Sequence, residues 1–87
     1  MDIIVRKPTK EEKELYSNYP TWGCEVSEFD WSYSDRETCI LIQGEVKVIY
    51  GNGKSVNFCA GDFVEFPKGL SCRWIVTKSV KKHYNFG

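Results

Sequence analysis

The chain has 87 residues, with 12 basic and 12 acidic side chains and therefore no net charge. This length is typical of one small domain, so it excludes a two-domain enzyme. Proteins that bind nucleic acids usually carry a basic excess, and the balanced charge therefore argues against such a partner. Hydrophobic residues make up 41% of the chain and aromatic residues 15%. This composition excludes a disordered protein.

The chain also lacks the sequence features of a membrane or secreted protein. No apolar run approaches the roughly 20 residues that a membrane-spanning helix needs. The first residues show neither the basic start nor the long apolar stretch of a secretory leader. We therefore expect a cytoplasmic protein that does not bind a membrane. In that compartment its four cysteines are predicted to be small buried hydrophobic residues rather than disulfide partners.

Residues 1–21 are predicted to form a strand and a short helix. Residues 2–6 are apolar and β-branched, as in a short strand. Thr9 precedes a helical segment at residues 10–16, and Glu12 stands three positions after it. This spacing is that of a capping box, in which the Thr9 and Glu12 side chains bond to each other's backbone N–H groups.

The rest of the chain has the pattern of an all-β fold. Apolar and polar side chains alternate in short runs, separated by turn residues such as those at 51–53. The alternation changes phase between Val26 and Phe29, which predicts a bulge or bend near Glu28. Short strands with this regular spacing are typical of a sandwich or barrel. The predicted strands cover residues 22–26, 29–33, 38–42, 46–50, 55–58, 63–66, 70–77 and 81–86.

Two sequence stretches resemble the paired motifs of a known family. Residues 37–44 place six residues between a Glu and a Gly, and residues 61–69 read Gly, five residues, Pro, any residue, Gly. In this order and spacing they resemble the back half of the first cupin motif and the front half of the second. The flanking words at 29–33, 69–74 and 82–87 are similar to those of small cupins related to ureidoglycine aminohydrolase and to ethanolamine-utilisation cupins.

The resemblance spans residues 22–87 and implies a single domain over residues 1–87. The implied fold is a small jelly-roll barrel, the double-stranded β-helix, with a ligand pocket inside. Metal-dependent cupins bind their ion through three His and one Glu. By position those three His correspond here to Trp31, Tyr33 and Cys72, and only Glu37 matches the ligand set.

This departure predicts a pocket without a tightly bound metal. Indole does not ligate a metal through its N–H, and phenol is a poor ligand near neutral pH. The only histidine of the chain is His83, so a His-rich site is excluded. The alternative is a weakly held divalent ion bound by Glu37, Cys72 and water.

Strand alternation indicates which side chains would line the pocket. If Glu37 and Cys72 face inward, side chains two positions away on the same strands also do. We therefore expect a ligand-binding site with aromatic walls, one carboxylate and thiols. Its predicted residues are Trp31, Tyr33, Glu37, Cys39, Cys72 and Trp74.

Simpler interpretations of these residues stay open. The three aromatic residues fill the barrel if there is no pocket, since aromatic side chains dominate small cores. Glu37 forms a surface salt bridge with Arg36 if it is exposed. If it is buried, it requires a bond to Tyr33 or Arg73, or protonation. His83 is then a surface or barrel-lining imidazole.

Three functions remain as hypotheses at this stage. The first is binding of a small molecule without an essential metal. The second is hydrolysis or isomerisation of a nitrogenous metabolite, with Glu37 as general acid or base assisted by Tyr33 or Cys72. The third is a structural or interaction module, in which strand 2–6 pairs between two subunits of a homodimer.

Overall fold

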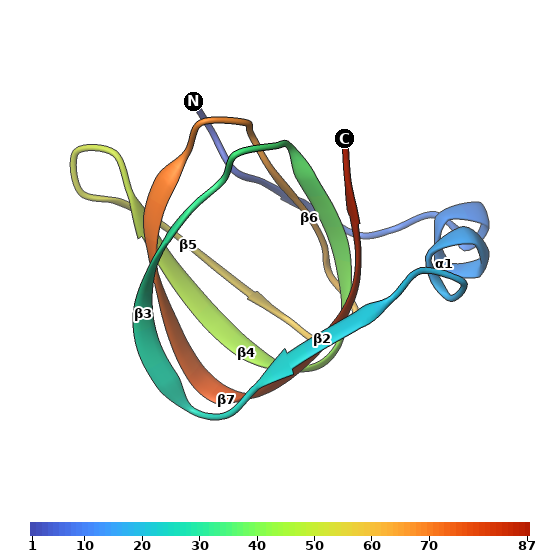
Figure 1. Cartoon of the computed structure of the whole chain (residues 1–87). Coiled ribbons are helices and arrows are strands. Elements are labelled where there is room, and N and C mark those ends of the chain that lie inside the picture. Colours follow the sequence, from blue (N-terminus) through green and yellow to red (C-terminus); the bar gives the residue numbers. More distant parts are fainter.

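The computed structural model describes residues 1–87 and contains seven strands and one short helix. All strand pairs are antiparallel, and the strands curl around a common interior (Figure 1). The predicted all-β barrel of cupin type with a short N-terminal helix is thus confirmed. The elements are β1 (Ile4–Arg6), α1 (Lys10–Tyr16), β2 (Thr21–Cys24), β3 (Ser27–Ser32), β4 (Glu37–Tyr50), β5 (Lys54–Cys59), β6 (Phe63–Phe66) and β7 (Ser71–Phe86).

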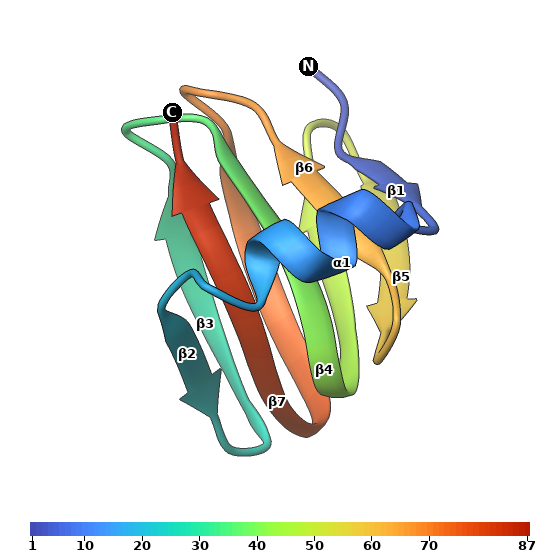
Figure 2. The ribbon, with the colours of Figure 1, turned by 90° about the vertical axis from the view of Figure 1, so that its right-hand side faces the viewer.

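Two long, bent strands organise the barrel. β4 and β7 pair along most of their length, the strands β2, β3, β5 and β6 attach to their free edges, and β1 pairs with β6. The main path through the sheet is β1-β6-β4-β7-β2, with β5 also on β4 and β3 also on β7. Figure 2 shows α1 lying across the outside of these strands. The start of β4 therefore lies beside the end of β7 in the barrel wall, with Glu37 opposite Phe86.

The long strands correct the prediction of four shorter ones. Breaks were expected around Gly44 and between residues 77 and 81, but the pairing of β4 with β7 continues there through register shifts. Gly44 has a φ of 99°, and a Cβ at this position would collide with the carbonyl oxygen of Ser79. Glycine thus allows the two strands to bend together without separating.

The predicted bend near Glu28 is displaced. Glu28 lies inside β3, where it is opposite Ile75 of β7. The break between β2 and β3 falls at Glu25 and Val26 instead. The change of phase in the sequence was correct, but it is produced by a turn between two strands rather than by a bulge within one.

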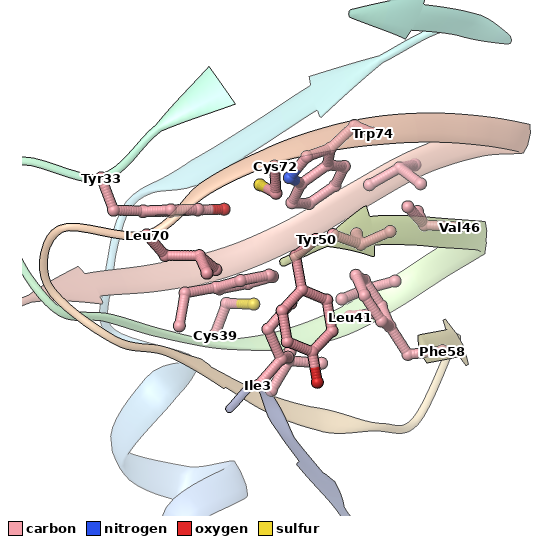
Figure 3. Close-up of a cluster of buried hydrophobic side chains, with 14 of the residues drawn as sticks. Ile3, Tyr33, Cys39, Leu41, Val46, Tyr50, Phe58, Leu70, Cys72 and Trp74 are labelled. Carbon is pink, nitrogen blue, oxygen red and sulfur yellow. The ribbon is translucent and has the colours of Figure 1, made fainter. Parts of the chain in front are cut away.

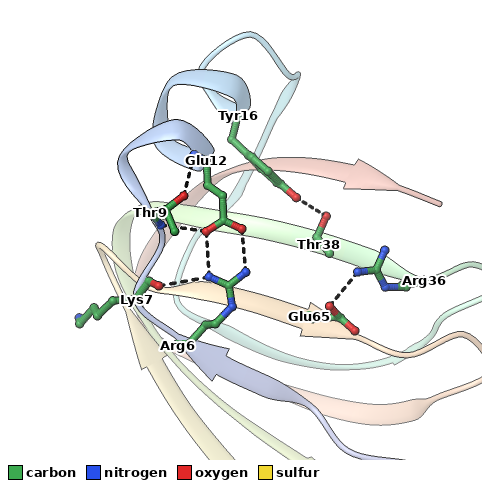
Figure 4. Close-up of polar contacts among 8 residues, drawn as sticks. All are labelled: Arg6, Lys7, Thr9, Glu12, Tyr16, Arg36, Thr38 and Glu65. Carbon is green, nitrogen blue, oxygen red and sulfur yellow. Dashed lines mark hydrogen bonds and ion pairs between the residues drawn. The ribbon is translucent and has the colours of Figure 1, made fainter.

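Helix α1 begins at the predicted capping box. The Thr9 side chain accepts a hydrogen bond from the Glu12 backbone, and the Glu12 side chain accepts one from the Thr9 backbone. Arg6 of β1 donates two further hydrogen bonds to Glu12, at 2.7 and 2.8 Å (Figure 4). The start of the helix is thereby tied to the first strand. No helix of this structure is long and apolar enough to cross a membrane.

Tyr16 attaches the end of α1 to the barrel. Its ring packs with Ile40 and Phe63 in a small buried cluster on the outer face. Its hydroxyl lies 2.6 Å from the hydroxyl of Thr38 on β4 (Figure 4). The outward-facing residues of β4 are buried here because the helix covers them.

The main core fills the interior of the barrel (Figure 3). Aromatic rings stack near its centre, with the Tyr33 and Phe66 centroids 4.7 Å apart and Phe66 and Trp74 5.7 Å apart. The centre of the interior is therefore filled by stacked rings. The buried core residues are Ile3, Tyr33, Cys39, Leu41, Val46, Val48, Tyr50, Phe58, Val64, Phe66, Leu70, Cys72, Trp74, Val76 and Val80.

The N-terminal strand pairs within its own chain. β1 runs antiparallel to β6, with Val5 opposite Val64. Only one of its two edges is occupied by this pairing, because β1 stands at the end of the strand order. The predicted pairing of two subunits through residues 2–6 stays a prediction, and it would use the other edge.

Candidate functional site

A cavity of about 210 Å³ lies between the inner faces of β2, β3, β4 and β7. Seven of its nine lining residues are aromatic, and the other two are a carboxylate and an ammonium group. The cavity is therefore an apolar hollow with one charged pair. Its lining residues are Trp22, Phe29, Trp31, Tyr33, Glu37, Trp74, Lys82, Tyr84 and Phe86.

The aromatic walls are held by contacts between rings. Trp74 is 2% exposed and stacks on Phe29, with ring centroids 5.9 Å apart. Trp22 meets the same indole edge to face, also at 5.9 Å. Trp31 is 49% exposed and its ring is 6.4 Å from that of Tyr33, so it forms a rim. The predicted aromatic residues Trp31, Tyr33 and Trp74 are thus brought together around one hollow.

Glu37 is the acidic group of the cavity. It is the first residue of β4, and its backbone lies between Phe66 of β6 and Phe86 of β7. The side chain is buried, and its Oε2 accepts a hydrogen bond from Lys82 Nζ at 2.5 Å. Glu37 therefore carries a buried ion pair rather than the exposed salt bridge considered from the sequence.

The two arginines considered as partners of Glu37 are engaged elsewhere. Arg36 forms a salt bridge with Glu65 at 2.8 Å. Arg73 points away from the cavity and pairs with Glu28 and Asp30, both at 3.1 Å. Both arginines lie on the outer surface, so the single cation that reaches the carboxylate is the lysine of β7.

Lys82 was not found by sequence reasoning. Its backbone lies between Leu41 of β4 and Trp22 of β2, in the middle of the sheet. The alternation Val80, Lys82, Tyr84 places it on the inner face, and this pattern was the signal that could have revealed it. It was missed because Lys82 stands in a charged run beside another lysine.

The Lys82 ammonium is surrounded by aromatic rings. Nζ lies 4.9 Å from the ring centroid of Trp74 and 5.1 Å from that of Trp22. Glu37 provides its only hydrogen-bond acceptor. An ammonium group has three N–H donors, so two of them have no oxygen acceptor within the protein, and aromatic rings lie nearby. The pocket thus contains a cation with unused donor capacity.

The two predicted thiols lie behind the cavity wall. Cys39 is fully buried in the core, and burial raises the pKa of its thiol to about 12. Burial likewise raises the pKa of Cys72 to about 11. Neither residue is among those that line the cavity. Both thiols are protonated near neutral pH, which disfavours Cys72 as a nucleophile.

The N–H of Trp74 is a second unused donor in the same wall. Its Nε1 is buried and has no hydrogen-bond partner. The Tyr33 hydroxyl and the Cys72 thiol approach this nitrogen without satisfying it (Figure 3). Burial, followed by the negative charge of Glu37, raises the pKa of Tyr33, so its hydroxyl keeps its proton.

The residues present do not fit the metal of metal-dependent cupins. A divalent ion at the inherited position requires the free carboxylate of Glu37, but the Lys82 ammonium occupies it. The matching thiol of Cys72 is protonated, and thiolate is the form that ligates. No group of three or more His, Cys, Asp or Glu side chains in the structure is arranged so that it could hold a metal ion.

His83 lies apart from the cavity. Its ring Nδ1 donates a hydrogen bond to the backbone carbonyl oxygen of Tyr19, at 2.9 Å. It neighbours Lys82 on β7 and therefore points to the opposite face of the strand. The structure places the imidazole against the segment after α1, away from Glu37.

A family model described as the EutQ-like cupin domain matches residues 11–84. The chain belongs to the EutQ-like cupin family. The small cupin inferred from the motifs at 37–44 and 61–69 is thus confirmed. The further likeness to ureidoglycine aminohydrolase stays a prediction.

Solved structures extend this comparison. A DUF861 family protein from Thermotoga maritima is 48% identical, with a TM-score of 0.94 over 99% of this EutQ-like cupin and 100% of that chain. The EutQ protein of Clostridium difficile is 23% identical, with a TM-score of 0.69 over 76% of this chain and 52% of that one. This cupin therefore spans about half of that EutQ chain. At this identity the comparison concerns the fold alone.

A third similar structure is that of a putative ethanolamine utilization protein Q from Salmonella typhimurium, and this comparison also concerns the fold alone. It is 21% identical, with a TM-score of 0.69 over 97% of this chain and 68% of that one. No curated protein matches the chain. The activity of this EutQ-like cupin must therefore be argued from its own cavity.

Proposed function

We propose that this cupin binds a small, planar, uncharged molecule with a carbonyl group, and that it does so without a metal. The observation that carries the proposal is the buried Lys82 ammonium, which lines an aromatic cavity and has only one acceptor. A carbonyl oxygen in the cavity would accept one of its unused N–H groups. Hydrogen bonds to charged donors stabilise a complex by about 1.5–3 kcal/mol.

The size and walls of the cavity support a small flat ligand. Its volume of about 210 Å³ is below the roughly 300–1,000 Å³ of pockets for drug-sized molecules. Seven aromatic side chains leave flat, apolar surfaces for stacking. The exposed ring of Trp31 forms the rim, where a ligand would enter.

The charge of the site supports a neutral ligand. Glu37 and Lys82 compensate each other, so the cavity has no net charge. A ligand carboxylate would add a second anion beside one ammonium, and an unpaired buried charge costs several kcal/mol. A carbonyl group avoids this cost and still accepts a hydrogen bond.

The same pair supports binding without a metal. The Lys82 ammonium is bound to the Glu37 carboxylate, which a cupin metal would need as its ligand. The ammonium therefore supplies a positive charge beside this carboxylate. A divalent ion would have to displace it and leave a lysine cation buried next to the ion. Two positive charges in direct proximity repel each other strongly in a low-dielectric interior.

Titration with benzamide, followed by NMR, tests this proposal. All three tryptophans of the chain line the cavity, so their indole N–H signals report on its occupancy. We expect saturable shifts of these signals with benzamide, and binding at least tenfold weaker for benzoate, which has the same shape but a negative charge. A chelator should leave the benzamide affinity unchanged.

A neutral version of the pair provides the matched control. The double variant Glu37→Gln, Lys82→Met keeps the approximate volumes and removes both charges. It should bind benzamide about tenfold more weakly, which corresponds to about 1.4 kcal/mol. Absence of saturable shifts in the wild-type protein, or loss of benzamide binding on chelation, would contradict the proposal.

A further inference from the structure

Lys82 differs from every other lysine of the protein. The chain has nine lysines, of which eight are exposed. The side chain of Lys82 is 6% exposed, lines the aromatic cavity and reaches a carboxylate. Buried lysines are the ones that proteins use as nucleophiles toward carbonyl compounds, and the amine attacks once its proton has been removed.

Glu37 is placed to take the proton that blocks this lone pair. Its Oε2 is 2.5 Å from Lys82 Nζ along the hydrogen bond. Transfer of the proton leaves an amine whose nitrogen lone pair can attack a carbonyl carbon held in the cavity. No other carboxylate lines the cavity, so the proton moves only within this pair.

We infer that the Lys82 amine forms an imine with a small aldehyde or ketone bound in the cavity, with Glu37 as its proton partner. This inference rests on the proposed binding of a carbonyl compound. It extends that proposal from binding to reversible covalent capture. The substrate class is an uncharged aldehyde or ketone small enough for about 210 Å³.

The chemistry balances without a further reactant. The ammonium gives a proton to Glu37, and the nitrogen lone pair forms a bond to the carbonyl carbon. The electrons of the carbonyl π bond move to oxygen, which takes the proton from Glu37. The added nitrogen then returns a proton to Glu37. Glu37 protonates the hydroxyl group, the C–O bond breaks, water leaves and the nitrogen lone pair completes the C=N bond.

The product fits the same surroundings as the free lysine. The protonated imine carries one positive charge and faces the Glu37 carboxylate, so the charges of the cavity are the same before and after the reaction. The rings of Trp22 and Trp74, which lie 5.1 and 4.9 Å from Nζ, would then stabilise the iminium cation by the same cation–π contact.

Reductive trapping tests the inference in the wild-type protein. The probe is benzaldehyde, with cyanoborohydride present to reduce any imine to a stable benzylamine, and mass spectrometry then locates the label. Lys81 is the matched control, because it neighbours Lys82 in sequence and is exposed. We expect Lys82 to be labelled at least tenfold faster than Lys81, and benzamide to suppress labelling of Lys82 alone.

Two variants separate the roles of the pair. Lys82→Arg keeps the charge but should remove all fast labelling. Glu37→Gln should slow the labelling of Lys82 at least tenfold, with circular dichroism confirming that the barrel is folded. Labelling of wild-type Lys82 no faster than Lys81 would overturn the inference whether or not the variants fold. If benzamide still binds in that case, only the covalent step fails; if benzamide does not bind, the proposed function fails first.

Discussion

At the scale of single residues, the main feature of the candidate site is that its one carboxylate is paired with a lysine. Glu37 is the one metal ligand that the cupin motif shares with this chain, and it is buried against Lys82. A buried carboxylate needs a positive partner. Here a lysine from β7 provides the positive charge, and aromatic side chains occupy two of the inherited histidine positions, at Trp31 and Tyr33.

The first prediction concerns the coupling of this pair. Lys82→Met alone should lower the free energy of unfolding by about 3–5 kcal/mol, because it leaves Glu37 buried without a partner. The double variant Glu37→Gln, Lys82→Met should recover most of this loss. Urea denaturation of the wild type, both single variants and the double variant measures the coupling energy. Additive losses would mean that the two groups do not interact.

The second prediction concerns the Cys72 thiol. Its pKa is raised to about 11 by burial, so at pH 8 only about one molecule in a thousand carries the reactive thiolate. Iodoacetamide should therefore label Cys72 far more slowly in the folded protein than in urea, and the folded rate should rise tenfold per pH unit from pH 7 to 10. Mass spectrometry measures both rates. Rapid labelling of folded protein at pH 7 would indicate an activated thiol.

At the scale of elements, α1 depends on its first turn. The helix has seven residues, too few to be stable alone, and its start is bonded to β1 through Arg6 and Glu12. Thr9→Ala removes the cap, so it should reduce the free energy of unfolding by about 1 kcal/mol. Thr9→Ser keeps the hydroxyl and is the matched control. Urea denaturation that gives equal losses for both variants would exclude the cap as the cause.

The fourth prediction adds a pH dependence to this element. Hydrogen bonds from Arg6 lower the pKa of Glu12 from 4.5 to about 2. A lowered pKa means that the bond stabilises the fold above pH 4.5 and that this stabilisation is lost as pH falls from 4.5 toward 2. Glu12→Gln should thus be less stable than the wild type at pH 7 and approach it below pH 3.

Thermal unfolding of both proteins at several pH values measures this difference. Glu11→Gln is the matched control, because Glu11 lies in the same helical turn and has no salt-bridge partner. It should show a much smaller dependence on pH. A Glu12 effect that is constant from pH 7 to 2 would exclude the ion pair.

At the scale of the whole molecule, the barrel depends on the joint bend of β4 and β7. Gly44 and Gly53 both have positive φ, at 99° and 84°. A Cβ on Gly44 would strike backbone carbonyl oxygens of β7, whereas a Cβ on Gly53 would meet no atom within 4 Å. Gly53→Ala should therefore cost only the conformational strain, about 1–2 kcal/mol.

Gly44→Ala carries the same strain and adds the collision. It should lower the free energy of unfolding by at least 2 kcal/mol more than Gly53→Ala, or prevent folding. Urea denaturation of the two variants compares them directly. Equal losses would mean that the close approach of β4 and β7 at this point does not constrain the barrel.

The architecture could be predicted from local patterns, and so could four of the nine residues that line the candidate site. The capping box at Thr9, the turn at residues 51–53 and the inward alternation of Trp31 and Tyr33 all depend on neighbours in sequence. The continuity of β4 through Gly44 could not be predicted, because a bulge and a chain reversal both favour glycine.

The burial of Lys82 could not be predicted either, because it depends on a residue that is distant in sequence. A lysine is normally exposed, and only the distant carboxylate of Glu37, 45 positions away, makes its burial acceptable. Cys39 and Cys72 were expected in the cavity lining because they face inward, but alternation does not say which inward side chains larger rings will cover. Such contacts join residues on different strands of the barrel. They are therefore defined only once the chain has folded.

The central claim is that the Lys82 ammonium, rather than a metal ion, provides the positive charge beside Glu37. The most direct measurement is the metal content of the protein purified without chelators or metal-affinity tags, by plasma mass spectrometry. We expect iron, manganese, nickel and zinc each to be far below one ion per chain. One ion per chain, bound tightly enough to survive dialysis, would contradict the account.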